Sequence, residues 1–321
     1  MSSFLLSDFP RPVRLSEYQS FTDRLLEKTM SVDGILAFYG IGSVSAPGIS
    51  DLDFVAVFRN DTTVLEDSRQ TLNGNEKYML IHSLYGASAE QFLAAQSFSF
   101  FQPFRLLAGK EQLPSQLPVA DPAIRDQVAL EYLLKFYISL KLQHAYKLIR
   151  VRSVLLNAKG AMIDLHHLAP DHPEREKFAD ELTNIRADWF KGNSPLDAFR
   201  SWYHRFSNWF FLFVEEKFRQ LPFYIPEVRS YRMSRNLFIH NGPRLQATSK
   251  GMTFPILYPL LGNRYFKVLN RINRLEVTLP MQRDNVPAVM LDYFRFNTEH
   301  RAYNRLHLPH YLPLTSSLHL Q

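Results

Sequence analysis

The stretch from Phe38 to Phe58, FYGIGSVSAPGISDLDFVAVF, constrains the fold of this chain more than any other. Two apolar runs flank a loop rich in Gly, Ser and Pro, and the second run begins at two aspartates. On a strand, residues i and i+2 point to the same face, so Asp51 and Asp53 are expected to project together while Leu52 points into the core. Neighbouring carboxylates repel one another unless a cation lies between them. The stretch therefore predicts two strands with a divalent cation held by the aspartate pair.

The loop between the two runs has the composition of an anion-binding turn. Gly40-Ile41-Gly42-Ser43 follows an apolar strand. Glycines allow backbone N–H groups to approach an anion closely, and the Ser43 hydroxyl adds one more donor. A phosphate-binding turn beside a metal-binding pair of aspartates provides the parts that phosphoryl or nucleotidyl transfer requires. The alternative interpretation is a β-hairpin whose aspartates lie at its polar rim.

Gly42-Ser43, followed by Ser50 to Asp53 and the apolar residues Phe54 to Val57, resembles the signature of the DNA polymerase β-like nucleotidyltransferase superfamily. The resemblance implies a nucleotidyltransferase fold, with a mixed sheet flanked by helices. It also implies that the Gly-Ser pair binds the triphosphate of a nucleoside triphosphate and that the two aspartates bind one or two Mg²⁺ ions. The implied activity is transfer of a nucleoside monophosphate, for which we expect AMP from ATP, with release of pyrophosphate. The acceptor stays open between a small molecule, a sugar, a protein side chain and an RNA end.

One part of the family pattern is missing from this chain. Many members bring a third carboxylate from a neighbouring strand, but the matching segment, YMLIHSLYG from Tyr78 to Gly86, contains none. His82 lies at its centre, and a neutral imidazole can accept a proton, although it is a poor ligand for Mg²⁺. Three interpretations stay open: His82 is the catalytic base, a carboxylate from elsewhere completes the site, or the chain is a catalytically impaired binding or regulatory protein. The carboxylates considered for the second interpretation are Glu76, Glu131 and Asp164.

The order of the predicted elements indicates an α+β chain. We assign residues 1–115 to the nucleotidyltransferase-like domain, with a helix at 15–30, strands at 34–40, 52–59 and 78–86, a helix at 89–98 and a last strand or loop at 104–109. A proline-containing linker at 111–122 separates it from a helical bundle domain at 123–245. Helices are expected there over 123–159 as one helix or a pair, at 174–190, across the aromatic stripe from Phe199 to Phe218, and at 228–240. Residues 246–321 form a basic C-terminal extension with a helix at 261–275.

A second candidate site lies in SRNLFIHNG, from Ser234 to Gly242. Arg235 and His240 resemble the Arg-x4-6-His motif of HEPN domains, which are helical bundles that sometimes cleave RNA. The resemblance implies a metal-independent RNase in which Arg235 stabilises charge on a phosphate while His240 moves a proton. The alternative is a basic residue and a histidine at the end of a helix, where the helix dipole favours them.

Composition limits the setting in which the chain works. The absence of cysteine excludes disulfides, thiolate zinc sites and a cysteine nucleophile. A formal charge of +6 suits a polyanionic ligand such as a nucleotide. The first residues lack a basic start followed by a long apolar run, and no apolar cluster approaches the length that a bilayer requires. We therefore expect a soluble, cytoplasmic protein without a membrane partner.

Overall fold

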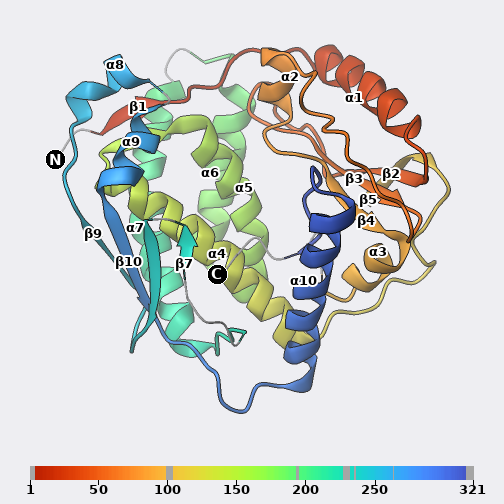
Figure 1. Cartoon of the computed structure of the whole chain (residues 1–321). Coiled ribbons are helices and arrows are strands. Elements are labelled where there is room, and N and C mark those ends of the chain that lie inside the picture. The colour runs from red at the N-terminus through yellow and green to blue at the C-terminus, as the bar shows by residue number, and fades with distance from the viewer. Residues whose placement is uncertain are drawn as a thin grey trace. The chain divides into compact units, whose positions relative to one another are not determined.

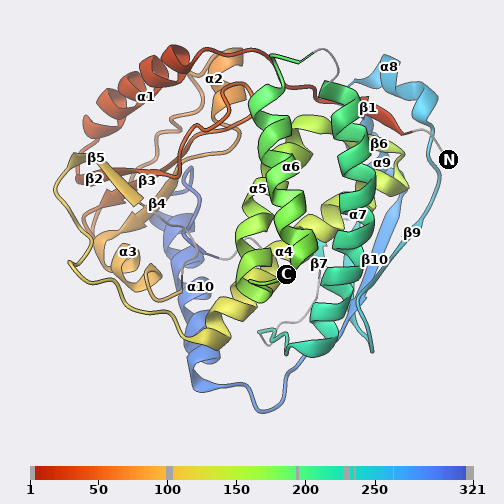
Figure 2. The same cartoon turned by 180° about the vertical axis from the view of Figure 1, so that it is seen from behind.

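The computed structural model describes residues 4–98, 104–192, 195–226, 232–234, 236–262 and 264–315 (Figures 1 and 2). It is an α+β structure with mixed sheets. Its contacts divide the chain into two compact units. The first, called the sheet unit below, consists of Arg11–Arg125 and Pro287–Ser316. The second, called the helical unit, consists of Met1–Pro10, Asp126–Val286 and Ser317–Gln321.

The sheet unit is built on a four-stranded mixed sheet with the order β4-β3-β2-β5. β2 (Ile35–Ile41) pairs antiparallel with β3 (Asp53–Phe58) and with β5 (Phe104–Gly109). β4 (Tyr85–Ser88) lies parallel to β3 at the edge. The two apolar runs of the opening stretch therefore form adjacent strands, as the sequence predicts.

Residues along each strand alternate between the two faces of this sheet. Apolar side chains cover both faces. On one face, α1 (Leu15–Met30) buries residues that recur every three or four positions on one side of the helix. Their cluster includes Tyr18, Phe21, Leu25, Phe38, Phe54 and Phe58. On the other face, Phe92 of α3 (Ala89–Ala95) packs against the opposite residues of the same strands. This second cluster includes Ala37, Tyr39, Val55 and Val57.

The segment after residue 286 returns to the sheet unit. α10 (Ala288–His307) packs against β4 and α3. Beyond the helix, Tyr311 enters the core cluster of α1, and the N–H of Leu312 donates to the carbonyl oxygen of Leu84 at 2.8 Å. Residues 287–316 therefore belong with the N-terminal sheet, whereas the sequence suggests a separate extension over 246–321.

The helical unit contains four long helices. They are α4 (Pro122–Ala145), α5 (Val151–Leu168), α6 (Pro173–Asp188) and α7 (Pro195–Gln220). α5, α6 and α7 run side by side (Figure 2). The aromatic stripe of α7 is buried, with the rings of Trp202 and Phe206 stacked 4.6 Å apart. This confirms that the stripe forms the core of a helical bundle.

A second four-stranded sheet completes the helical unit, with the order β7-β8-β10-β9. Its strands are β7 (Arg232–Ser234), β8 (Leu237–Asn241), β9 (Gln246–Lys250) and β10 (Arg274–Leu279). Between β9 and β10 lie η1 (Pro255–Leu257), α8 (Tyr258–Leu261) and α9 (Arg264–Ile272). β1 (Leu5–Ser7) pairs in parallel with β6 (Leu148–Arg150). None of the helices in the described ranges combines the length and apolar character of a membrane-spanning segment.

Two predicted elements are wrong. The segment 78–86 is not one strand, because Tyr78 and Met79 end a helix, α2 (Gly74–Met79), and only residues from Tyr85 onward join the sheet. The side chain of Asn73 starts this helix by accepting hydrogen bonds from the N–H groups of Asn75 and Glu76. The expected helix over 228–240 is contradicted by β8, whose pairing with β10 supplies long-range partners that overrule the local helical pattern.

Candidate metal centre

The candidate site lies where β2 ends and β3 begins. Ile41 is the register partner of Asp53, so Gly42 follows directly after the residue opposite this aspartate. Gly42 has a φ of 66°, a left-handed conformation that favours glycine. A Cβ at this position would have no atom within 4 Å, so one side of the backbone is open. The turn therefore presents its backbone beside the first residue of β3.

Two tyrosines hold the loop between these strands in place. Tyr18 of α1 donates its hydroxyl hydrogen to the carbonyl oxygen of Ser50 at 2.8 Å and accepts a hydrogen bond from the N–H of Gly48. Tyr78 of α2 donates to the carbonyl oxygen of Gly48 at 2.6 Å. The backbone N–H of Leu52 donates to the carbonyl oxygen of Met79 at 2.8 Å. The backbone that carries the aspartates is thus fixed by both neighbouring helices.

Asp51 and Asp53 flank a buried leucine, as the sequence predicts. Leu52 packs in the core cluster of α1, while both aspartates are partly exposed. Only Asp53 lies on the strand; Asp51 lies in the loop before it. The two carboxylates nevertheless approach one another closely enough to share a ligand.

His82 supplies a third ligand atom to this pair. One nitrogen or oxygen from each of Asp51, Asp53 and His82 lies within 4.8 Å of the other two. The Nε2 atom of His82 lies 2.7 Å from Oδ1 of Asp53, and its Nδ1 atom lies 2.8 Å from the carbonyl oxygen of Ser83. His82 reaches this position from the loop between α2 and β4, and not from the centre of a strand as the sequence predicts.

Among the residues that the structure describes, no lysine or arginine neutralises Asp53. Within the described part of the chain, its ion-pair contact is the one with His82, and no lysine or arginine lies within 4.0 Å of its carboxylate. Burial lowers the pKa of His82, but the nearby Asp53 carboxylate, the Ser83 carbonyl and the charge of Asp51 together raise this pKa above its usual value. Each of the charged neighbours that act on the imidazole is therefore an acid.

One atom of the centre has no hydrogen-bond partner. Oδ1 of Asp53 is buried and accepts no aligned hydrogen bond, although it lies 2.7 Å from the ring nitrogen of His82. A buried carboxylate oxygen without a partner is costly, and coordination of a cation removes that cost. The donor set of two carboxylates and one imidazole therefore fits a divalent cation.

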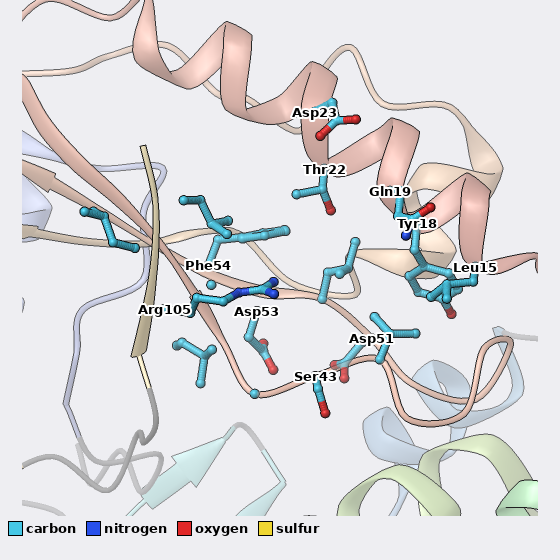
Figure 3. Close-up of a pocket in the computed structure, with 17 residues that line it drawn as sticks. Leu15, Tyr18, Gln19, Thr22, Asp23, Ser43, Asp51, Asp53, Phe54 and Arg105 are labelled. Carbon is cyan, nitrogen blue, oxygen red and sulfur yellow. The ribbon is translucent and has the colours of Figure 1, made fainter. Parts of the chain in front are cut away.

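A cavity of about 540 Å³ adjoins the centre (Figure 3). Its lining includes Gly42, Ser43, Asp51 and Asp53, and Figure 3 shows the side-chain oxygens of the last three directed to the same side. The remaining lining residues come from α1, from β5, and from β2, β3 and the loop between them. The polar ones among them are Tyr18, Gln19, Thr22, Asp23 and Arg105. The predicted phosphate-binding turn and the predicted aspartate pair thus face one cavity.

Arg105 places a positive charge in this cavity, and the sequence does not identify it. Arg105 is the register partner of Gly40, and a Cβ at Gly40 would lie 3.9 Å from Nη2 of Arg105. A side chain at this position would therefore make only an ordinary van der Waals contact with the guanidinium group. Among the described residues Arg105 has no ion-pair partner, so its charge is available to an anion in the cavity.

None of the carboxylates considered as a third ligand belongs to the cluster found among the described residues. Glu76 binds Nη2 of Arg24 at 2.6 Å and accepts a hydrogen bond from the N–H of Asn73, so both of its oxygens are engaged. Glu131 and Asp164 belong to α4 and α5 in the helical unit. Glu131 is buried and accepts a hydrogen bond from Gln127. Within the described residues the third member of the cluster is a histidine.

The second candidate site is not assembled as a helical motif. Arg235 lies outside the described residues. His240 lies on β8, paired with Thr278 of β10, and is exposed. The HEPN-like expectation includes a helix at this position, whereas His240 lies on a strand.

Comparison of the chain with protein-family models and with curated protein sequences gives no match in either case.

Proposed function

We propose that the sheet unit catalyses nucleotidyl transfer: it binds a nucleoside triphosphate and a divalent cation and moves the nucleoside monophosphate to an acceptor. The observation that carries this proposal is the convergence of a Gly-Ser turn and an Asp-Asp-His cluster on the ends of two adjacent strands. A triphosphate needs positive charge and backbone N–H donors close together. A cation held by carboxylates supplies the positive charge, and the Gly-Ser turn beside it supplies the donors.

Each group has a role in this proposal. Asp51 and Asp53 hold the cation, which polarises a phosphoryl oxygen and offsets the charge that develops on the leaving pyrophosphate. Gly42 and Ser43 donate hydrogen bonds to phosphate oxygens, and Arg105 adds a guanidinium that pairs with a phosphate from the sheet side of the cavity. The acceptor is a small molecule, a sugar, a protein side chain or an RNA end.

The test is release of pyrophosphate from each of the four nucleoside triphosphates in the presence of Mg²⁺ or Mn²⁺. Asp51→Asn and Asp53→Asn each keep the size of the side chain but remove the charge that holds the cation. We expect each to lower kcat by at least about a hundredfold, which corresponds to a few kcal/mol of transition-state stabilisation. Asp33→Asn is the matched control, because Asp33 is 98% exposed and lies in the turn before β2. Equal pyrophosphate release by all three variants would refute the proposal.

A second candidate function is nucleotide binding without turnover. The observation that favours it is the histidine at the position where a third carboxylate is expected, since an imidazole differs from a carboxylate in charge and as a base. In that case nucleotide binding depends on the divalent cation and on Asp53, but no pyrophosphate is released with any acceptor class. Equilibrium dialysis with labelled nucleotide, run beside the pyrophosphate assay, separates the two functions.

A further inference from the structure

We infer that the Asp51-Asp53-His82 centre binds a first-row transition ion, such as Mn²⁺, in preference to Mg²⁺, with Nε2 of His82 as a ligand. This inference rests on the cation site of the proposed function and gives that site a different metal from the Mg²⁺ that the sequence suggests. It concerns the free protein and a metal ion, so it can be tested without a nucleotide or an acceptor.

The first step concerns the protonation of His82. Its Nδ1 atom lies 2.8 Å from the carbonyl oxygen of Ser83, and a carbonyl oxygen can only accept a hydrogen bond. Nδ1 therefore carries the proton, and in the neutral imidazole the lone pair is on Nε2. A hydrogen bond from the other ring nitrogen to a backbone carbonyl is the usual arrangement of a histidine that binds a metal, because it fixes both the tautomer and the ring orientation.

The second step concerns the contact between His82 and Asp53. Nε2 and Oδ1 are 2.7 Å apart, yet Oδ1 accepts no aligned hydrogen bond. Oδ1 of Asp53 therefore does not lie in the direction in which the N–H bond or the lone pair of Nε2 points. Two ligands in cis positions of an octahedral ion, each about 2.1 Å from it, lie roughly 3 Å apart, and each lies about 45° from the other's bond to the metal. The pair of atoms thus has the spacing and the misalignment of two ligands of one ion.

The third step concerns the donor set. Mg²⁺ prefers an octahedron of oxygens, so a nitrogen ligand lowers the affinity of a site for it. First-row transition ions accept imidazole together with carboxylate, and their affinity for nitrogen exceeds that of Mg²⁺. Mn²⁺ combines this tolerance with octahedral coordination and with a preference for carboxylate and phosphate oxygens. A centre with one imidazole and two carboxylates therefore favours first-row transition ions such as Mn²⁺ over Mg²⁺.

This assignment gives His82 a different role from that of a catalytic base. Nδ1 is occupied by the Ser83 carbonyl, and Nε2 faces the aspartate oxygen. With Nε2 bound to the ion, neither nitrogen is left to accept a proton from an acceptor hydroxyl. His82 is then a metal ligand that the chain uses in place of a third carboxylate.

The experiment is titration of the full chain with Mn²⁺ alone, followed by the electron paramagnetic resonance signal of the free ion and by competition with Mg²⁺. We expect Mn²⁺ to bind at least about tenfold more tightly than Mg²⁺. Electron spin echo modulation of bound Mn²⁺ should show coupling to an imidazole nitrogen. A preference for Mg²⁺, or bound Mn²⁺ without nitrogen coupling, would overturn the inference, and neither readout depends on a variant.

Substitutions of His82 sharpen this test. His82→Ala should abolish the nitrogen coupling and lower Mn²⁺ affinity at least tenfold, whereas His82→Asp supplies an oxygen ligand and should shift the preference toward Mg²⁺. His240→Ala is the matched control, because it removes an exposed histidine of the helical unit. If His82 were only a positively charged partner of Asp53, then His82→Ala would tighten binding of both ions, which contradicts the inference.

The metal-binding experiment and the pyrophosphate assay can give different results, so the inference and the proposed function can fail separately. A chain that binds Mn²⁺ through His82 but releases no pyrophosphate supports the inference and contradicts nucleotidyl transfer. A chain that releases pyrophosphate with Mg²⁺ and Mn²⁺ alike, and whose metal preference is unchanged in His82→Ala, contradicts the inference and supports nucleotidyl transfer.

Discussion

Leu52 determines how the two acidic side chains of the centre are presented. Its side chain is buried in the core of the sheet unit, and its N–H donates to the carbonyl oxygen of Met79. The residues before and after it are consequently turned away from this core. Two charged groups that would repel one another in an isolated chain are thus held together by burial of the leucine between them, and a cation bound between them would relieve the repulsion.

A buried histidine of the sheet unit makes its stability depend on pH. His300 on α10 is 1% exposed, and its Nε2 atom lies 3.3 Å from the carbonyl oxygen of Gly86, while Nδ1 has no partner among the described residues. Burial lowers the pKa of His300 to about 4; the Gly86 carbonyl opposes this change, and the charge of Arg301 adds to it. The folded state therefore holds this imidazole neutral.

The direction of the pH effect follows from the lowered pKa. Below the usual histidine pKa of about 6.5 the unfolded chain takes up a proton that the folded chain does not, so stability is lost as the pH falls from about 6.5 to 4. We expect His300 to account for about 3 kcal/mol of this loss. Urea denaturation at pH 7 and pH 4 should show a smaller loss for His300→Gln, which keeps an N–H donor but does not titrate. An equal loss in both proteins would contradict the assignment.

Sequence alone identifies the residues of the centre that are close along the chain. The Gly-Ser pair and the two aspartates lie in one segment, so their arrangement follows from strand geometry and one loop. His82 is selected by the sequence from a segment that is assigned to the wrong element. Arg105 is missed because its place opposite Gly40 depends on the register between β2 and β5, which no local pattern encodes.

At the scale of single elements, α2 links the metal centre to the core. It ends at Met79, whose carbonyl oxygen receives the N–H of Leu52, and the next loop carries His82. Its first turn is closed by Asn73, which accepts two backbone N–H groups, and by Glu76, whose carboxylate accepts the N–H of Asn73. This reciprocal capping stabilises a helix that would be too short to form alone.

We expect Asn73→Ala to lower the free energy of unfolding of the sheet unit by about 1 kcal/mol, because it leaves the first N–H groups of α2 without an acceptor. Asn75→Ala is the control, since Asn75 lies on the same helix and caps nothing with its side chain in the described structure. Urea denaturation of the full chain measures both. A loss of the same size in the control would show that the cap is not the cause.

Elements that carry their own start signals and periodicity are predicted well from the sequence. The helix at Leu15–Met30 has the expected bounds, and β2, β3, β5 and α7 lie where their patterns place them. The segment 78–86 is wrongly predicted to be one strand, because its apolar run covers both the end of α2 and the start of β4. Residues 237–240 are misread as part of a helix because strand pairing with β10, more than thirty residues later, decides their conformation.

At the scale of the whole chain, the sheet unit is assembled from two distant segments. Arg11–Arg125 supplies the four strands, and Pro287–Ser316 supplies α10 and the residues that pack on β4. Gly86 of β4 packs closely against the side chain of Tyr311, and a Cβ at this glycine would lie 2.7 Å from Cβ of Tyr311. The close approach of the two segments therefore requires glycine at this position.

Gly86→Ala tests this assembly. We expect it to lower the free energy of unfolding by about 1–3 kcal/mol, because the added methyl group overpacks the contact between β4 and the C-terminal segment. Gly74→Ala is the matched control: a Cβ there meets no atom within 4 Å, and alanine suits a helix. Thermal denaturation measures the stability of both variants. A Gly86→Ala protein as stable as the control would contradict the close contact between Gly86 and Tyr311.

The return of the C-terminal segment is the part of the fold that the sequence does not predict. Its contacts join residues about two hundred positions apart, such as Gly86 with Leu312. Hydrophobic periodicity shows that a segment has an apolar face but not which distant face covers it. For this reason residues 246–321 read as one extension, although 287–316 complete the sheet unit.

The most direct test of the account is a crystal structure of the chain soaked with Mn²⁺ and a non-hydrolysable nucleoside triphosphate, with anomalous data collected at the manganese edge. We expect an anomalous peak about 2.1 Å from carboxylate oxygens of both Asp51 and Asp53, with phosphate oxygens beside Gly42 and Ser43. At saturating Mn²⁺, a map without a peak between these two carboxylates, or with the triphosphate bound away from the Gly-Ser turn, would contradict it.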